Sequence, residues 1–171
     1  ARMRTLLDAL AAYSQALNES PTALSSSSLQ SALRIVAANL DAQIQACGAE
    51  VTGVDLPKVG LKLERSMELL TNLIGNSLRF RGEAAPKIEV SASPTDDGMW
   101  AVSVRDNGMG IPPEECEAVF KPFVKVEGRK YGGAGLGLSV CGKIVEAHGG
   151  TIRIEPALGG GAICTFTLPE G

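Results

Sequence analysis

The sequence is poor in several residue types, and each shortage limits the kind of core or the class of protein that it can form. Aromatic residues make up only 4% of the 171 residues, so the core must be built from aliphatic side chains. The 16 lysine and arginine residues are outnumbered by 19 acidic residues, and the net charge of −3 argues against a nucleic-acid-binding protein. No apolar run approaches the ~20 residues that a membrane-spanning helix needs, and no signal peptide is visible. We therefore expect a cytoplasmic protein whose chain makes no membrane contact.

Cysteine and histidine do not form a recognisable metal site. The sequence has four cysteines: Cys47, Cys116, Cys141 and Cys164. Their spacing does not match that of metal ligands, and three of the four lie in apolar stretches. We interpret them as reduced, buried thiols. The only histidine, His148, comes at the end of a predicted helix, where the helix dipole favours it, so we interpret it as structural.

The hydrophobic content of 44% is sufficient for one domain of ordinary size plus an appendage.

Residues 2–18 are predicted to form a helix whose apolar residues recur in steps of three and four, the pattern of a coiled coil or helical bundle. This seam consists of Met3, Leu6, Leu10, Tyr13 and Leu17. Two heptads do not hold a helix alone, so the segment requires partners from outside the chain. The alternative is an amphipathic helix that packs on its own domain. A polar stretch through Ser25–Ser28 predicts a linker or a short edge strand, and we place a domain boundary there, giving segments 1–20 and 21–171.

The rest of the chain predicts a mixture of helices and strands. Helices are expected at residues 29–46, at 64–80 and after the glycine-rich segment 132–137, with a short one at 112–120. Strands are expected at 49–56 and in two hairpins, 87–93 with 99–105 and 151–156 with 162–168, and a short extended piece at 59–63.

The helix at 64–80 has two different faces. Its apolar side carries Met67, Leu70, Ile74 and Leu78, and its polar side carries Glu68, Asn72, Asn76 and Arg79. Two asparagines one turn apart are poor helix formers, but their carboxamide oxygens can bind a hard cation such as Mg²⁺. An arginine one turn further on can reach a phosphate. A plain solvated face is the alternative interpretation.

A predicted strand ends in Asp106-Asn107-Gly108-Met109-Gly110. The Asp106 carboxylate can accept a hydrogen bond from the exocyclic amine of a nucleobase. Glycines at 108 and 110 allow the backbone to approach a flat ring closely. Taken alone, the same residues are also typical of an ordinary turn.

A basic segment, residues 121–133, precedes the glycine-rich Gly133-Ala134-Gly135-Leu136-Gly137. Its four cations suit a lid over phosphates, with a surface loop as the alternative: Lys121, Lys125, Arg129 and Lys130. A glycine-rich turn at a helix N-terminus favours phosphate binding, because free N–H groups and the positive end of the helix dipole meet there. The P-loop pattern does not match, since Gly137 is followed by Leu138-Ser139. The dinucleotide-binding pattern does not match either, because no strand directly precedes these glycines.

The order of these motifs, together with Phe120-Lys121-Pro122-Phe123, resembles the four boxes of the ATP-binding catalytic domain of sensor histidine kinases. That domain belongs to the superfamily of DNA gyrase, Hsp90 and MutL, and the resemblance covers residues 25–170. Three further segments resemble phytochrome-like kinases: residues 2–14, 77–82 and 143–150. The resemblance implies an α/β (α+β) two-layer sandwich with a mixed, mostly antiparallel sheet and helices on one face. Residues 1–20 would be the second helix of a dimerisation and phosphotransfer hairpin, and residues 21–171 the catalytic domain.

The resemblance also implies roles for individual residues. Asp106 would bind the adenine amino group in a pocket shaped by Gly108, Gly110 and Ile111. Asn76 would ligate Mg²⁺, with Asn72 nearby. The remaining residues would lie near the base and phosphates or anchor the lid. The phosphate and base contacts are Arg79, Phe80, Arg129, Lys130, Gly133, Gly135, Leu136 and Gly137, and the lid anchors are Phe120 and Phe123.

The implied reaction is transfer of the γ-phosphoryl group of Mg·ATP to a histidine on a helix outside this chain, and from there to a response regulator. The relatives that hydrolyse ATP use a glutamate where this chain has Asn72, which cannot act as a base. We reject His148 as the acceptor and expect the fragment not to phosphorylate itself. The intact protein would be a homodimer through its helical bundle. The alternatives are a serine kinase of the anti-sigma type and a non-catalytic scaffold that keeps the ATP-binding fold.

Overall fold

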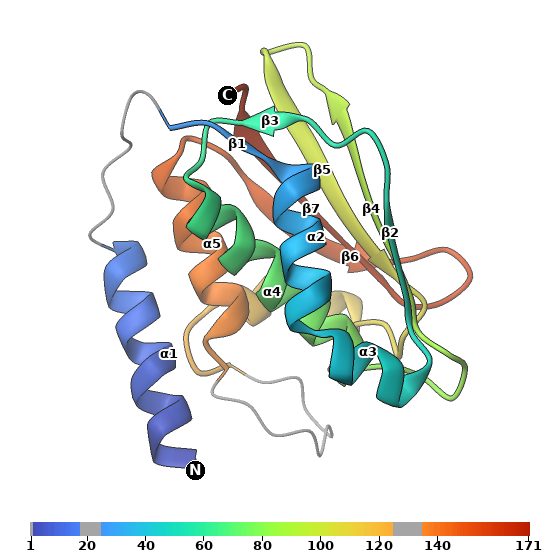
Figure 1. Ribbon diagram of the computed structural model, residues 1–171. Coiled ribbons are helices and arrows are strands. Elements are labelled where there is room, and N and C mark those ends of the chain that lie inside the picture. The colour runs from blue at the N-terminus through green and yellow to red at the C-terminus, as the bar shows by residue number, and fades with distance from the viewer. Residues whose placement is uncertain (1, 18–24, 125–134) are drawn as a thin grey trace.

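The computed structural model describes residues 2–17, 25–124 and 135–171, and some side chains of the first segment are left out (Figure 1). The helices lie on one face of a five-stranded sheet. The elements follow one another as α1 (Arg2–Leu17), β1 (Ser27–Ser28), α2 (Leu29–Asn39), α3 (Asp41–Cys47), β2 (Glu50–Gly53), β3 (Lys58–Val59), α4 (Leu63–Arg79), β4 (Lys87–Pro94), β5 (Met99–Asp106), η1 (Pro113–Glu115), η2 (Ala118–Phe120), α5 (Gly137–Ala147), β6 (Ile152–Pro156) and β7 (Ala162–Pro169).

The large sheet has the strand order β2-β4-β5-β7-β6. Strands β2 and β4 are parallel, and every other neighbouring pair is antiparallel. A second, two-stranded sheet pairs β1 with β3. The predicted two-layer sandwich with a mixed, mostly antiparallel sheet is therefore confirmed, and so is the short edge strand at Ser27–Ser28.

The core lies between the sheet and the helices. Strand β7 alternates strictly between buried and half-buried residues, so one of its faces meets the helices. The largest fully buried side chains are aliphatic apart from Phe166, as the scarcity of aromatic residues predicts. Helix α4 lies between α2 and α5 and contacts both (Figure 1). Its predicted apolar side is correct, since Leu70, Ile74 and Leu78 are buried.

The segment predicted as one helix at 29–46 is two helices. Leu40 separates α2 from α3 with φ −97° and ψ 5°, outside the helical region. Asn39 and Asp41 flank the break, and both are poor helix formers because their side chains compete for backbone hydrogen bonds. Gly48 ends α3 in the left-handed conformation that glycine adopts easily.

Two other boundaries also differ from the prediction. The strand expected at 49–56 is shorter, since β2 ends at Gly53. The helix expected at 112–120 is a pair of 3₁₀ turns, η1 and η2. Proline at positions 112 and 113 fixes the backbone there but removes two backbone donors, which favours short turns.

Helix α1 packs beside α5 of the same chain (Figure 1). Ala16 is buried and Tyr13 packs against the core, so the alternative of a helix on its own domain is correct for this face. A second apolar face remains exposed: Met3 is 77% exposed, and Leu7 and Leu10 are exposed as well. The predicted seam is therefore divided between two faces. Among the described helices, none is both long enough and apolar enough to cross a bilayer.

Candidate functional site

A cavity opens between α4 and the inner face of the sheet, with an empty volume of about 580 Å³ counted out to its open mouth. The wall is mainly apolar, with a small number of polar groups. Its lining residues are Leu73, Asn76, Ser77, Phe80, Val104, Asp106, Gly110, Ile111, Val119, Leu138, Ile154, Ala162 and Cys164.

Asp106 ends β5 and places its half-buried carboxylate in the cavity wall. Its Oδ1 accepts hydrogen bonds from the backbone N–H groups of Gly108, at 2.9 Å, and Ala162, at 3.2 Å. Its Oδ2 accepts one from the Ser77 hydroxyl at 2.9 Å. Donors from three elements of the fold therefore hold the carboxylate in one orientation.

Glycines surround Asp106 because the backbone is crowded there. A Cβ on Gly108 would lie 2.5 Å from the Phe80 carbonyl oxygen, which also accepts a hydrogen bond from Met109 N. Gly110 has φ +73°, and a Cβ there would lie 3.0 Å from the Gly161 oxygen. The structure thus ties the end of α4 to the loop after β5, and both predicted pocket glycines have a steric reason.

The two asparagines of α4 contact different parts of the site. Asn76 lines the cavity. Asn72 approaches the first residue of α5, since a Cβ on Gly137 would lie 3.1 Å from the Asn72 Oδ1. No described side chain caps this end of α5, so its first N–H groups and its positive dipole end are available to an anion. Carboxamide oxygens and a helix N-terminus therefore meet beside the cavity.

The remaining predicted site residues differ in where they lie. Phe80 and Ile111 line the cavity, whereas Leu136 is buried just before α5 and does not. Arg79 is on the exposed last turn of α4, outside the lining. Gly135 has φ +71° and accepts a hydrogen bond from Phe123 N at 2.9 Å. Arg129, Lys130 and Gly133 lie outside the described residues.

The two predicted lid anchors differ in burial. Phe120 packs against the core, whereas Phe123 is exposed and has φ +64°, an uncommon conformation for a residue with a side chain.

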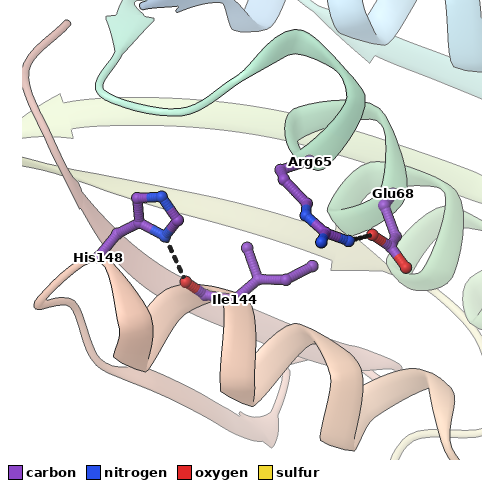
Figure 2. Close-up of polar contacts among 4 residues, drawn as sticks. All are labelled: Arg65, Glu68, Ile144 and His148. Carbon is purple, nitrogen blue, oxygen red and sulfur yellow. Dashed lines mark hydrogen bonds and ion pairs between the residues drawn. The ribbon is translucent and has the colours of Figure 1, made fainter. Parts of the chain in front are cut away.

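Figure 2 shows the polar contacts of His148 and Glu68. The His148 Nδ1 is 2.8 Å from the Ile144 carbonyl oxygen, so this nitrogen carries the proton and donates to its own helix. Glu68 accepts a hydrogen bond from Arg65 at 2.5 Å. The histidine is thus tied to the C-terminal turn of α5, and the carboxylate on the polar side of α4 is paired.

Three residues of the site were not predicted. Ser77 follows Asn76, and no motif in the sequence assigns it a role at the site. Gly161 was interpreted only as part of a hairpin turn, yet a Cβ there would lie 1.9 Å from the Asp106 carbonyl oxygen. Cys164 lines the cavity, and burial, with a smaller contribution from the Asp106 charge, raises the pKa of its thiol to about 12. Their importance depends on strand pairing that the sequence does not display.

Comparison with known proteins identifies the family of this chain. The family described as "Histidine kinase-, DNA gyrase B-, and HSP90-like ATPase" matches residues 62–171. Cyanobacterial phytochrome A of Nostoc sp. is 39% identical over 170 residues, which are 99% of this chain and 22% of that protein. The chain thus spans less than a quarter of this relative's length.

Solved structures are similar over nearly the whole chain. Full-length ShkA in complex with AMPPNP has a TM-score of 0.81 at 28% identity, covering 98% of this chain and 36% of that one. Histidine kinase ThkA in complex with the response regulator protein TrrA has a TM-score of 0.74 at 26% identity, covering 99% of this chain and 48% of that one. The chain therefore belongs to the family of histidine kinase-, DNA gyrase B- and HSP90-like ATPases, and within it to the ATP-binding catalytic domains of sensor histidine kinases.

Proposed function

We propose that the chain binds Mg·ATP and supplies its γ-phosphoryl group to a histidine on a helix of the intact protein, for relay to a response regulator. The observation that carries the proposal is the fixed Asp106 carboxylate in an apolar cavity, next to two asparagines and the N-terminus of α5. A base site and an anion site thus adjoin one another. This is the arrangement that a nucleoside triphosphate requires.

The adenine base would occupy the cavity. Apolar side chains from α4, β5, β6 and β7 offer surfaces for a flat ring, and Asp106 offers an acceptor for its exocyclic amine. Gly108 and Gly110 keep the backbone close to that ring, and Ile111 and Phe80 bound it. The similar structure of ShkA is a complex with AMPPNP, an ATP analogue, which supports nucleotide binding by this fold.

The phosphates would extend towards the N-terminus of α5, where Gly135 and Gly137 carry no side chain. Asn76, with Asn72 beside it, would supply oxygen ligands to Mg²⁺. Among the described residues, no cluster of three histidine, cysteine or acidic side chains could hold a metal by itself. Magnesium commonly keeps several waters and takes few protein ligands alongside substrate phosphates, so these donors fit an ion that arrives with the nucleotide. The ion would neutralise charge on the phosphates.

Arg79, Arg129, Lys130, Gly133 and Leu136 complete the predicted set of nucleotide-binding residues. Arg79 would reach the phosphates from the end of α4, and the two lid cations would contact the γ-phosphate. These roles rest on the resemblance, and mutagenesis of each position tests them.

The same residues favour phosphoryl transfer over hydrolysis. Asn72 occupies the position at which the ATP-hydrolysing relatives have a glutamate, and a carboxamide cannot accept a proton from water. Glu68, one turn earlier, is paired with Arg65 (Figure 2). Phosphoryl transfer needs positioning and charge neutralisation more than a base in this domain. The chain's residues thus supply what a kinase domain requires.

The partners follow from the same proposal. Residues 1–20 would be the second helix of a dimerisation hairpin, and residues 21–171 the catalytic domain. The exposed Met3, Leu7 and Leu10 would face the other helices of a homodimeric bundle. The ThkA–TrrA complex supports a response regulator as the final acceptor. A cytoplasmic location belongs to this proposal because ATP and response regulators are found there. We interpret His148 as a structural residue rather than the acceptor, with its Nδ1 donating to the Ile144 carbonyl oxygen at the C-terminal turn of α5.

Two measurements test the proposal. Calorimetry with ADP in the presence and absence of Mg²⁺ should show magnesium-dependent binding. A chain that binds no nucleotide up to millimolar concentration contradicts the proposal. The intact protein incubated with ATP should then contain an acid-labile phosphohistidine. Nucleotide binding without that product indicates a scaffold that keeps only the fold, and an acid-stable phosphoserine on a partner indicates an anti-sigma-type kinase.

A further inference from the structure

Ser77 lies directly after Asn76 on α4 and faces the sheet. It is only 7% exposed and lines the cavity. Its hydroxyl has one proton but two acceptors within reach, the Asp106 Oδ2 at 2.9 Å and the Leu73 carbonyl oxygen at 3.2 Å. The bond to the carboxylate is the stronger of the two, because it is shorter and its acceptor is charged.

The hydrogen bonds to Asp106 leave little of its carboxylate open. A carboxylate offers about four lone-pair sites, two on each oxygen. The N–H groups of Gly108 and Ala162 occupy both sites of Oδ1. Ser77 occupies one site of Oδ2. A single acceptor site, on Oδ2, therefore remains for a ligand.

We propose that Ser77 is a positioning residue that leaves Asp106 with one open acceptor site, and that this single site selects adenine against guanine. The proposal rests on the nucleotide-binding function above and specifies how the base is read. The adenine exocyclic amine needs one acceptor. Guanine presents two neighbouring donors, N1–H and the N2 amine, and a carboxylate matches such a pair only with both oxygens open. Oδ1 is closed here.

The backbone part of this arrangement is rigid. Gly161 has φ +86°, and a Cβ there would lie 1.9 Å from the Asp106 carbonyl oxygen, so the chain before Ala162 lies tightly against Asp106. The two backbone donors to Oδ1 are fixed by this packing. Ser77 supplies the third hydrogen bond through a side chain, and it is therefore the partner that a substitution can remove.

Ser66 provides a matched control. It is a second buried serine on α4, is 0% exposed, and its hydroxyl is hydrogen-bonded to that of Ser27 at 2.7 Å. Its pair joins α4 to β1, and it is absent from the cavity lining. Ser66→Ala therefore removes a buried hydroxyl from the same helix without touching Asp106.

The test measures the dissociation constants of ADP and GDP by calorimetry for the wild-type chain and for Ser77→Ala, Ser77→Thr and Ser66→Ala, each checked for folding by thermal unfolding. Loss of one positioned hydrogen bond should weaken ADP binding by about 3- to 10-fold in Ser77→Ala. GDP, which does not use the carboxylate, should change by less than about 2-fold, so the preference for ADP falls. Ser77→Thr keeps the hydroxyl and should restore the preference, and Ser66→Ala should retain it.

Three results overturn the proposal. Unchanged or tighter ADP binding in Ser77→Ala means that the hydroxyl does not position the acceptor. Equal weakening of ADP and GDP means that Ser77 has only a structural role. Wild-type chain that binds GDP as well as ADP means that one open site does not select the base. In each case ADP binding by the wild-type chain leaves the nucleotide-binding function standing, whereas a wild-type chain that binds neither nucleotide refutes that function as well.

Discussion

Replacement of Asp106 by asparagine tests the base site most directly, because it changes the chemistry of one group and leaves its shape almost unaltered. The amide oxygen of the variant should take the place of Oδ1, since two backbone N–H groups, from Gly108 and Ala162, point at that position. The amide nitrogen must then replace Oδ2. Ser77 can adapt by turning its proton to the Leu73 carbonyl oxygen, 3.2 Å away. We therefore expect Asp106→Asn to fold.

The variant should bind ADP poorly because a donor would face the donor on the base. A buried donor left without an acceptor costs ~1–3 kcal/mol, which corresponds to a loss of affinity of roughly 5- to 150-fold. Titration calorimetry of Mg·ADP with the wild-type and variant chains measures this loss. Asp97→Asn is the matched control, since Asp97 lies at the exposed turn between β4 and β5. An affinity for ADP that is unchanged in Asp106→Asn would refute the assignment of the cavity as the base site.

Three further predictions follow from the same site. Gly161→Ala should lower the free energy of unfolding by several kcal/mol relative to Gly159→Ala in chemical denaturation, because both positions have positive φ but only Gly161 would place its Cβ against the Asp106 oxygen. Equal losses would contradict the steric argument. Asn76→Ala should abolish most of the magnesium dependence of ADP binding in calorimetry, and a retained dependence would exclude Asn76 as the ligand. The raised pKa of Cys164, about 12 against an ordinary 9.0, keeps its thiol protonated in the folded chain. The unfolded chain releases that proton first, so stability should fall as pH rises from about 9 to 12. Cys164→Ala should reduce that dependence in denaturant titrations, and the buried Cys141, whose pKa is raised as well, should supply part of what remains.

The parts of the fold that the sequence predicts are those determined by local pattern. The alternation in residues 87–93 and 99–105, with Asp-Gly between them, predicts a hairpin, and β4 and β5 form one. The apolar stripe of α4 likewise predicts its buried side. In these cases the periodicity of one segment is sufficient, since each element buries the face that its own residues define.

Local pattern did not predict features that depend on several segments at once. Leu40 continues the apolar stripe of residues 29–46, yet the helix breaks there. Tyr13 belongs to the same seam as Met3, but packs against the core while Met3 is exposed. Gly161 acts on Asp106 only because β7 pairs with β5 and brings residues far apart in the chain together. The spacing of apolar residues within any single segment does not predict such consequences of tertiary packing.

Helix α4 sets the distance between the two halves of the site. Asn72 faces the start of α5, and Asn76, one turn later, lines the cavity. Ser77, the residue after Asn76, faces Asp106. The carbonyl of Phe80, at the end of the same helix, binds the loop after β5. Helical geometry fixes the offset between these positions at ~1.5 Å and ~100° per residue. A shift of α4 by one residue would therefore move the base contact and the metal ligand together. A single rigid helix would thus hold the proposed base contact and the proposed metal ligand in one register.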